Sequence, residues 1–171
     1  MKHFHLRALA PLMMLALALC WNSFAHAKDT AAQAANRRAI VAAYAQMDRA
    51  LMNKDVASAM VPVADDYQGY DVTRASSGRA QMERELRLLT MRGLQIPLSK
   101  TTVSKIQWRG PDAIVWCSSL VRLRGPGGTV EMSDTSREYW GKTARGWQIR
   151  QSVQLSARVV KDGNVIFDSN K

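Results

Sequence analysis

The stretch Gly146-Trp-Gln-Ile-Arg-Gln-Ser-Val-Gln-Leu-Ser-Ala157 decides the fold. Its apolar residues alternate with polar ones, which is the period of a β-strand that packs one face and exposes the other to water. We therefore predict a long strand over residues 147–157 with one face against a core. The apolar positions on that face are Trp147, Ile149, Val153 and Leu155.

The residues before this strand show the same period of two, beginning after Pro97. Two glycine-containing segments, Gly125-Pro-Gly-Gly128 and residues 141–146, interrupt the alternation and predict turns. Asp162-Gly163 lies between two short apolar runs, which is typical of a hairpin and predicts a C-terminal β-ribbon. The predicted earlier strands cover residues 101–108, 113–122 and 129–140.

Helical periodicity occupies the chain before residue 97. A first helix over about residues 32–53, which Asp29 or Thr30 can cap, places Ile40, Tyr44, Met47 and Leu51 on one face. A short second helix follows the cap residue Asp55, and Gly93 ends a third. Helices followed by meandering strands indicate an α+β domain. We expect a strongly curved antiparallel sheet wrapped around the long N-terminal helix, with a pocket at the open end of the cone.

The first 27 residues have the features of a cleaved signal peptide. Lys2 and Arg7 precede a short apolar run over residues 8–19, and Ala25-His26-Ala27 is a pattern that a signal peptidase accepts. The run is too short to span a membrane as a helix. We therefore predict cleavage after Ala27, a secreted or periplasmic protein, and a single domain over residues 28–171. Lipidation at Cys20 is the alternative.

Loss of residues 1–27 has a chemical consequence. The whole chain has 171 residues and a formal charge of +10; the predicted mature chain has 144 residues, a charge of +8, Cys117 as its one cysteine and no histidine. An intrachain disulfide, a histidine-based metal site, a Ser-His-Asp triad and a Cys-His dyad are therefore excluded. We expect no metal and no cofactor.

The order of elements resembles the nuclear-transport-factor-2-like (NTF2-like) superfamily, and in particular its small bacterial polyketide-cyclase-like and ketosteroid-isomerase-like members. The match covers about residues 32–156 and is carried by Asn53-Lys-Asp55, Gly78, Thr135-Ser-Arg-Glu-Tyr-Trp140 and Gly146-Trp-Gln-Ile149. The resemblance implies a cone-shaped (cystatin-like) fold, a ligand pocket inside the cone, and a homodimer through the outer sheet face. Many relatives carry a histidine on the final strand, where this chain has Gln151 and Val153.

Five residues of the N-terminal half are candidates for the pocket. Tyr44 and Asp48 lie four apart on the first helix, so both can face the same opening. Tyr67, Tyr70 and Asp71 follow at the predicted rim. Chemistry of the ketosteroid-isomerase type needs a carboxylate base and a phenol, and these residues supply both. The alternatives are a solvated helical Asp48 and a structural turn formed by Asp71.

The third predicted strand supplies a further acid, Asp134, which shares its parity with Trp140 and can face inward. A buried, unpaired carboxyl there would have a raised pKa and act as a base, whereas a paired one would be structural. Tyr139 lies on the opposite face, and which face lines the cone stays open. Trp116 is a candidate to stack on a ligand, with the core or a dimer interface as the alternative. Cys117 is expected to be an inert, buried thiol.

Three functions remain open. The first is an exported, cofactor-free protein that binds a small, largely apolar ligand in its cone. The second is an isomerase, cyclase or dehydratase that uses an Asp base, from among Asp48, Asp71 and Asp134, together with a Tyr. The third is a structural or assembly module of the cell envelope. Nucleic acid is not an expected partner, because the chain has none of the motifs of nucleic-acid-binding modules.

Overall fold

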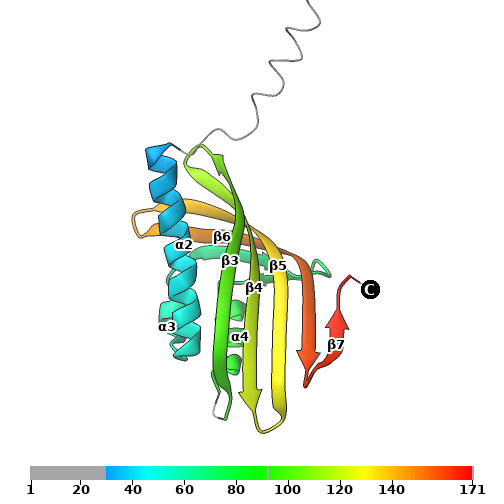
Figure 1. Ribbon diagram of the computed structural model, residues 1–171. Helices are drawn as coiled ribbons and strands as arrows, with labels where there is room; N and C mark the ends of the chain where they lie inside the picture. Colours follow the sequence, from blue (N-terminus) through cyan, green and yellow to red (C-terminus); the bar gives the residue numbers. More distant parts are fainter. Residues whose placement is uncertain (1–29, 92, 171) are drawn as a thin grey trace, which may run out of the picture. The chain divides into compact units, whose positions relative to one another are not determined.

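Seven strands form one curved sheet in the computed structural model, which describes residues 30–91 and 93–170 (Figure 1). The strand order is β2-β1-β6-β5-β4-β3, and β7 also pairs with β6. The strands are β1 (Val63–Tyr70), β2 (Ser76–Gly78), β3 (Gln95–Arg109), β4 (Asp112–Gly125), β5 (Gly128–Thr143), β6 (Gly146–Lys161) and β7 (Asn164–Asp168).

The sheet is mixed, whereas we expected it to be antiparallel. Strands β3 to β6 form the predicted antiparallel meander, but β1 runs parallel to β6, with Val63 opposite Ile149 and Tyr70 opposite Val153. The short strand β2, helix α4 and the three long strands β3 to β5 separate β1 from β6 in the chain. No tight hairpin therefore constrains the direction in which β1 returns to the sheet.

Two local irregularities differ from the sequence pattern. Strand β3 begins at Gln95, before Pro97, because β3 is an edge strand and its pairing with β4 shifts register between Gln95 and Leu98. Leu155 is 48% exposed although we predicted it in the core. The register between β5 and β6 shifts beside Leu155, so this residue is the extra one of a bulge and leaves the apolar face.

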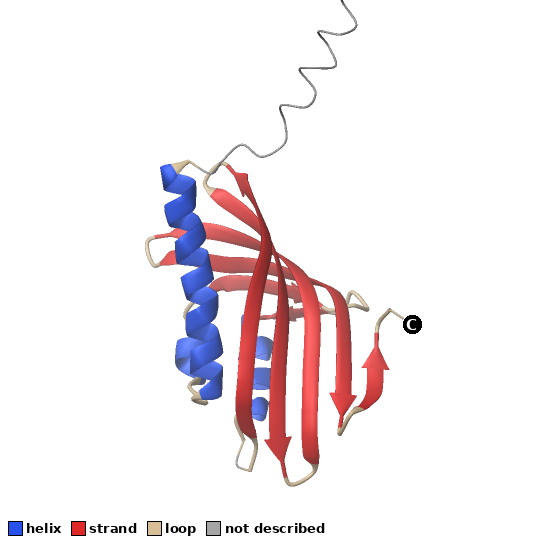
Figure 2. Ribbon diagram, viewed as in Figure 1, coloured by secondary structure: helices blue, strands red, loops and turns tan. Residues whose placement is uncertain are grey.

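Three helices accompany the sheet in the described residues: α2 (Ala31–Met52), α3 (Val56–Ala59) and α4 (Arg79–Leu89). A capping box begins α2, because Gln33 N donates to Thr30 Oγ1 and Thr30 N donates to Gln33 Oε1. Asp55 Oδ1 accepts from Ser58 N at 3.0 Å and caps α3, as predicted. Figure 2 shows α2 extended alongside the strands.

All of the strands belong to one compact unit, Ala35–Lys171; of the other unit, Met1–Ala34, the structure describes residues 30–34. The predicted signal peptide, its cleavage site after Ala27 and Cys20 lie outside the described residues. None of the described helices is long and apolar enough to span a bilayer.

The core lies between the helices and one face of the sheet. Trp140 of β5 is 1% exposed and forms its centre with Ile40 of α2 and Val115 of β4, and Met82 and Leu86 of α4 pack against the same cluster. Trp147, Ile149 and Val153 of β6 are buried, as the alternating pattern predicted. The packed face of the sheet is therefore the face that carries Trp140 and Ile149.

Asp48 fastens α2 to the edge strand β3. Its Oδ1 accepts from Ser99 Oγ at 2.8 Å, and its Oδ2 accepts from Thr101 N at 2.7 Å. Thr101 Oγ1 also donates to Oδ1, at 3.2 Å. Because Thr101 N lies on the outer edge of the sheet, this side chain supplies a hydrogen bond that a neighbouring strand would otherwise provide.

We expect Asp48→Ala to destabilise the fold by about 2–3 kcal/mol, because hydrogen bonds to a carboxylate are lost and Thr101 N loses its acceptor. The free energy of unfolding in urea measures the loss. Asp66→Ala is the matched control, since Asp66 is exposed on β1, and it should change stability by less than about 0.5 kcal/mol. Equal losses in the two variants would contradict the role assigned to Asp48.

Candidate functional site

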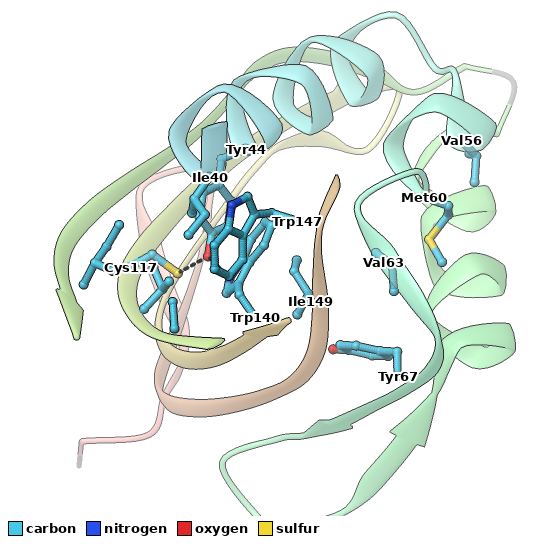
Figure 3. Close-up of a cluster of buried hydrophobic side chains, with 13 residues drawn as sticks. Ile40, Tyr44, Val56, Met60, Val63, Tyr67, Cys117, Trp140, Trp147 and Ile149 are labelled. Atoms are coloured by element: carbon cyan, nitrogen blue, oxygen red, sulfur yellow. Dashed lines mark hydrogen bonds between the residues drawn. The ribbon is translucent and has the colours of Figure 1, made fainter. Parts of the chain in front are cut away.

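A buried carboxyl, Glu138, lies on the packed face of β5, two residues from Trp140. Tyr44 of α2 donates its hydroxyl to Glu138 Oε2 at 2.6 Å, and Trp140 Nε1 is 3.1 Å from both the Tyr44 hydroxyl and Glu138 Oε2. The Tyr44 hydroxyl also lies 3.6 Å from Cys117 Sγ, as the dashed line in Figure 3 marks. Helix α2 and the sheet are therefore joined inside the core by polar groups that hydrogen-bond to one another.

Burial dominates the electrostatics of this cluster. Desolvation raises the pKa of Glu138 to about 7, although hydrogen bonds from Tyr44 and Trp140 favour the ionised form. Burial, followed by the charge of Glu138, raises the pKa of Cys117 to about 12 and the pKa of Tyr44 well above its usual value. Tyr44 and Cys117 therefore stay protonated at neutral pH, while Glu138 titrates near it.

A cavity of about 340 Å³ lies beside this cluster, within the size range of small-molecule sites. Its walls come from β1, the turn after β1, β2, α4, β5 and β6. Three of the described lining residues carry carboxylates, and none is Lys, Arg or His. The lining residues are Tyr67, Gly69, Tyr70, Asp71, Ala75, Ser76, Ser77, Gln81, Glu85, Asp134, Ser136, Ser152 and Gln154.

Asp134 is the inward acid of this cavity. Alternation along β5 places it on the same face as Ser136 and Glu138. This is the inward face that we predicted for Asp134 because it shares its parity with Trp140. Burial raises the pKa of Asp134 to about 6, and a hydrogen bond with Ser119 partly opposes that shift. Asp134 makes no ion pair within the described part of the chain, although it also lines a neighbouring hollow of about 460 Å³ that contains Lys100 and Arg158.

Tyr67 supplies a phenol on the opposite wall. Its side chain points from β1 into the fold (Figure 3), and burial together with the charge of Glu138 raises the pKa of Tyr67 to about 12. The hydroxyl is therefore a hydrogen-bond donor at neutral pH. It extends over Gly69, where an added Cβ would lie 2.8 Å from the Tyr67 hydroxyl oxygen and 2.9 Å from Ser77 Oγ. The close approach of the ring to the strand thus needs glycine at position 69.

The structure brings four of the predicted site residues together at the cavity: Tyr67, Tyr70, Asp71 and Asp134. Tyr44 lies deeper, in the Glu138 cluster, and is 4% exposed. Asp71 closes the turn after β1, since its Oδ1 accepts from Thr73 N, Thr73 Oγ1 and Ala75 N, and these bonds lower its pKa. The turn reading of Asp71 is thus confirmed, with Asp71 also on the cavity rim.

The remaining candidates lie elsewhere. Asp48 is half-buried, hydrogen-bonded to β3, and not part of the cavity lining. Trp116 and Tyr139 adjoin Cys117 and Glu138 along their strands, so they point to the opposite face of the sheet. On that face each ring lies near a basic side chain. Lys105 Nζ is 4.7 Å from the centroid of the Trp116 ring, and Arg137 Cζ is 5.6 Å from the centroid of the Tyr139 ring.

Sequence reasoning missed Glu138, although a signal for it was present. Positions 134, 136, 138 and 140 share one parity, so the alternation that places Asp134 and Trp140 inward also places Glu138 inward. The charge of Glu138 favoured a surface position instead. The second difference concerns the cavity, which is lined mainly by hydroxyl, amide and carboxyl groups where we expected an apolar pocket. The described residues contain no group of three His, Cys, Asp or Glu side chains arranged for a metal ion.

We expect Glu138→Gln to flatten the dependence of stability on pH. The folded state holds the Glu138 proton up to a pKa of about 7, against 4.5 for an unperturbed glutamate, so this group stabilises the fold at low pH and its contribution is lost as pH rises through 7. The loss is on the order of 3 kcal/mol, and glutamine removes it while keeping an acceptor for Tyr44. Urea unfolding at pH 5, 6.5 and 8 measures it.

Glu131→Gln is the matched control, because Glu131 lies on the same strand in a half-exposed pair with Arg122. That variant should keep the decline in stability above pH 5. An unchanged decline in Glu138→Gln would contradict a buried, titrating Glu138.

Similarity between this chain and known proteins is found among solved structures. No family model matches the chain, and no curated protein matches it in sequence. A conserved protein from Planctomyces limnophilus has a TM-score of 0.64 at 17% identity, over 74% of this chain and 98% of that one. An NTF2-like protein from Cytophaga hutchinsonii has a TM-score of 0.57 at 13% identity, over 69% of this chain and 95% of that one.

A third solved structure, a scytalone dehydratase-like protein from Novosphingobium aromaticivorans, has a TM-score of 0.62 at 12% identity, over 74% of this chain and 87% of that one. Identities this low establish the fold and leave function to the site. The chain therefore has the α+β cone fold of the NTF2-like superfamily, as its sequence predicted.

Proposed function

We propose that this protein binds a small, polar, positively charged organic molecule, an amine, in the cavity between Tyr67 and Asp134. One observation carries the proposal: the described lining holds three carboxylates, two phenols and no basic side chain, in a chain whose formal charge is +10. Basic residues exceed acidic ones in the whole chain, so a cavity wall whose charged residues are all acidic differs from the average composition.

The energetics of Asp134 favour the same ligand. Asp134 is half-buried, and desolvation raises its pKa to about 6, so ionisation of this carboxyl is less favourable on the wall than in open water. An ammonium group would give Asp134 a direct ion-pair partner, and the rings of Tyr67 and Tyr70, which also line the cavity, would add cation–π attraction. Hydroxyls of Ser136 and Ser152 supply further hydrogen-bond partners on the wall.

Benzylamine is a suitable probe, with benzyl alcohol as its neutral counterpart. We expect calorimetry at pH 7.5 to give benzylamine a roughly tenfold lower Kd, which corresponds to one charge-assisted hydrogen bond. The advantage should shrink as pH falls through about 6, because Asp134 becomes protonated while the amine stays charged. Asp134→Asn should reduce the advantage of benzylamine and abolish its dependence on pH near 6, while Asp71 and Glu85 keep their charges.

Asp112→Asn is the charge-matched control, since Asp112 is exposed at the start of β4 and lies away from the cavity lining, and it should leave both affinities unchanged. Equal affinities of benzylamine and benzyl alcohol for the unaltered protein would overturn the amine proposal.

A second candidate is proton transfer, and the position of Asp134 favours it. A general base works best when its pKa lies near the working pH, and Asp134 has a pKa of about 6 on a cavity wall. In this reading Asp134 takes a proton from the carbon beside a carbonyl, and the Tyr67 hydroxyl donates to the enolate oxygen. Asp134 then returns a proton to the same carbon. Glu138, behind the wall, does not reach the substrate.

Hydrogen–deuterium exchange of cyclohexanone in D₂O tests this chemistry without a known substrate. We expect the exchange rate to rise with pH through about 6, and Asp134→Asn to lower it by about 10²- to 10⁴-fold. Tyr67→Phe should lower it less. A rate that is the same for Asp134→Asn and Asp112→Asn would exclude Asp134 as the base.

Export and pairing of two copies through the outer sheet face stay predictions from the sequence.

A further inference from the structure

A second hollow, independent of the cavity, lies between α2 and the end of the β5–β6 hairpin. We call it the α2 groove; its volume is about 490 Å³. Its floor is apolar and includes Ala42 of α2, Val61 before β1, and Trp147 of β6. Val61 is 55% exposed, so its side chain is available to a ligand in the groove.

Three basic side chains also line the α2 groove. Arg49 comes from the last turn of α2, and Lys142 and Arg145 come from the hairpin, while no described lining residue is acidic. Arg145 Nη2 lies 2.6 Å from Asp65 Oδ2, outside the lining, and that pair is solvent-exposed. Arg49 and Lys142 make no ion pair within the described part of the chain.

The small side chains of α2 keep the groove open. Ala39, Ala42, Gln46 and Arg49 are exposed and recur at intervals of three, four and three residues, so they form one stripe along the helix. Alanine at two of these positions lets an extended aliphatic chain approach the helix backbone. The last residue of the stripe is Arg49, so a positive charge lies at the end of the stripe that starts with the two alanines.

We propose that the α2 groove binds a free fatty carboxylate, with its aliphatic chain on Ala42, Val61 and Trp147 and its carboxylate at Arg49 and Lys142. Charge complementarity selects the head group, since Arg49 and Lys142 line the groove without an ion-pair partner in the described part of the chain and no described lining residue is acidic. The apolar floor selects the tail, because burying it removes both the tail and the exposed Val61 side chain from water. The site is separate from the Asp134 cavity, which has the opposite charge.

Decanoate, below its micelle-forming concentration, is the probe. We expect calorimetry to detect its binding and the indole N–H signal of Trp147 to shift in NMR spectra. Decanol should bind at least fivefold more weakly, and the decyltrimethylammonium cation more weakly still. Lys142→Gln and Arg49→Gln should each raise the decanoate Kd roughly two- to fivefold, as expected for an exposed charge pair.

Ala42→Glu places a carboxylate in the groove and should raise the Kd more than about tenfold. Val41→Glu, on the neighbouring exposed face of α2, and Lys161→Gln, at the end of β6, are charge-matched controls that should leave it unchanged. Asp134→Asn should also leave decanoate binding intact, so the two sites fail independently.

Three results would overturn the proposal: no decanoate binding at millimolar concentration, equal affinities for decanoate and decanol, or a Kd that Ala42→Glu leaves unchanged. Vesicles of an anionic phospholipid serve as the last arm. Sedimentation of the protein with vesicles through Arg49 and Lys142, without decanoate binding, would assign the groove to a membrane surface and likewise overturn the fatty-carboxylate assignment.

Discussion

The contact between the Tyr44 hydroxyl and Glu138 Oε2, at 2.6 Å, joins the long helix to the centre of the sheet. It places a carboxyl in the core, where an unpaired polar group is costly, and satisfies it with Tyr44 and Trp140. The contact fixes the rotation of α2 about its axis, because the side chain of Tyr44 must face β5 to reach Oε2. The rest of the helix follows, with Ile40 one turn away in the core and Asp48 one turn away at β3.

The same strand then leads from core to cavity. Along β5 the inward side chains run from Trp140 through Glu138 and Ser136 to Asp134, so the packed face becomes gradually more polar. Glu138 is enclosed, whereas Asp134 reaches the cavity wall, yet burial raises the pKa of both. The negative charge of Asp134 also raises the pKa of Glu138, and because Asp134 has a pKa of about 6, the charge on the cavity wall changes close to neutral pH.

Patterning predicted the elements well because helices and strands bury their faces with fixed periods. The helix around Tyr44, the meander up to Trp147 and the inward side of Asp134 all follow from that rule. The parallel return of β1 and the bulge at Leu155 depend on long-range pairing, which local periodicity does not contain. Glu138 was missed for a different reason: the pattern placed it inward, and only contact with Tyr44 from a distant segment makes a buried carboxyl acceptable.

Carbon-13 NMR titration of the side-chain carboxyls tests the central claim, which is that enclosure by the cone raises the pKa of two neighbouring acids on β5. The account predicts two titrations displaced from the bulk of the carboxyls, with a pKa of about 6 for Asp134 and about 7 for Glu138. Midpoints near 4 for both groups would contradict it, because they would mean that water reaches the strand and that no enclosed carboxyl site exists.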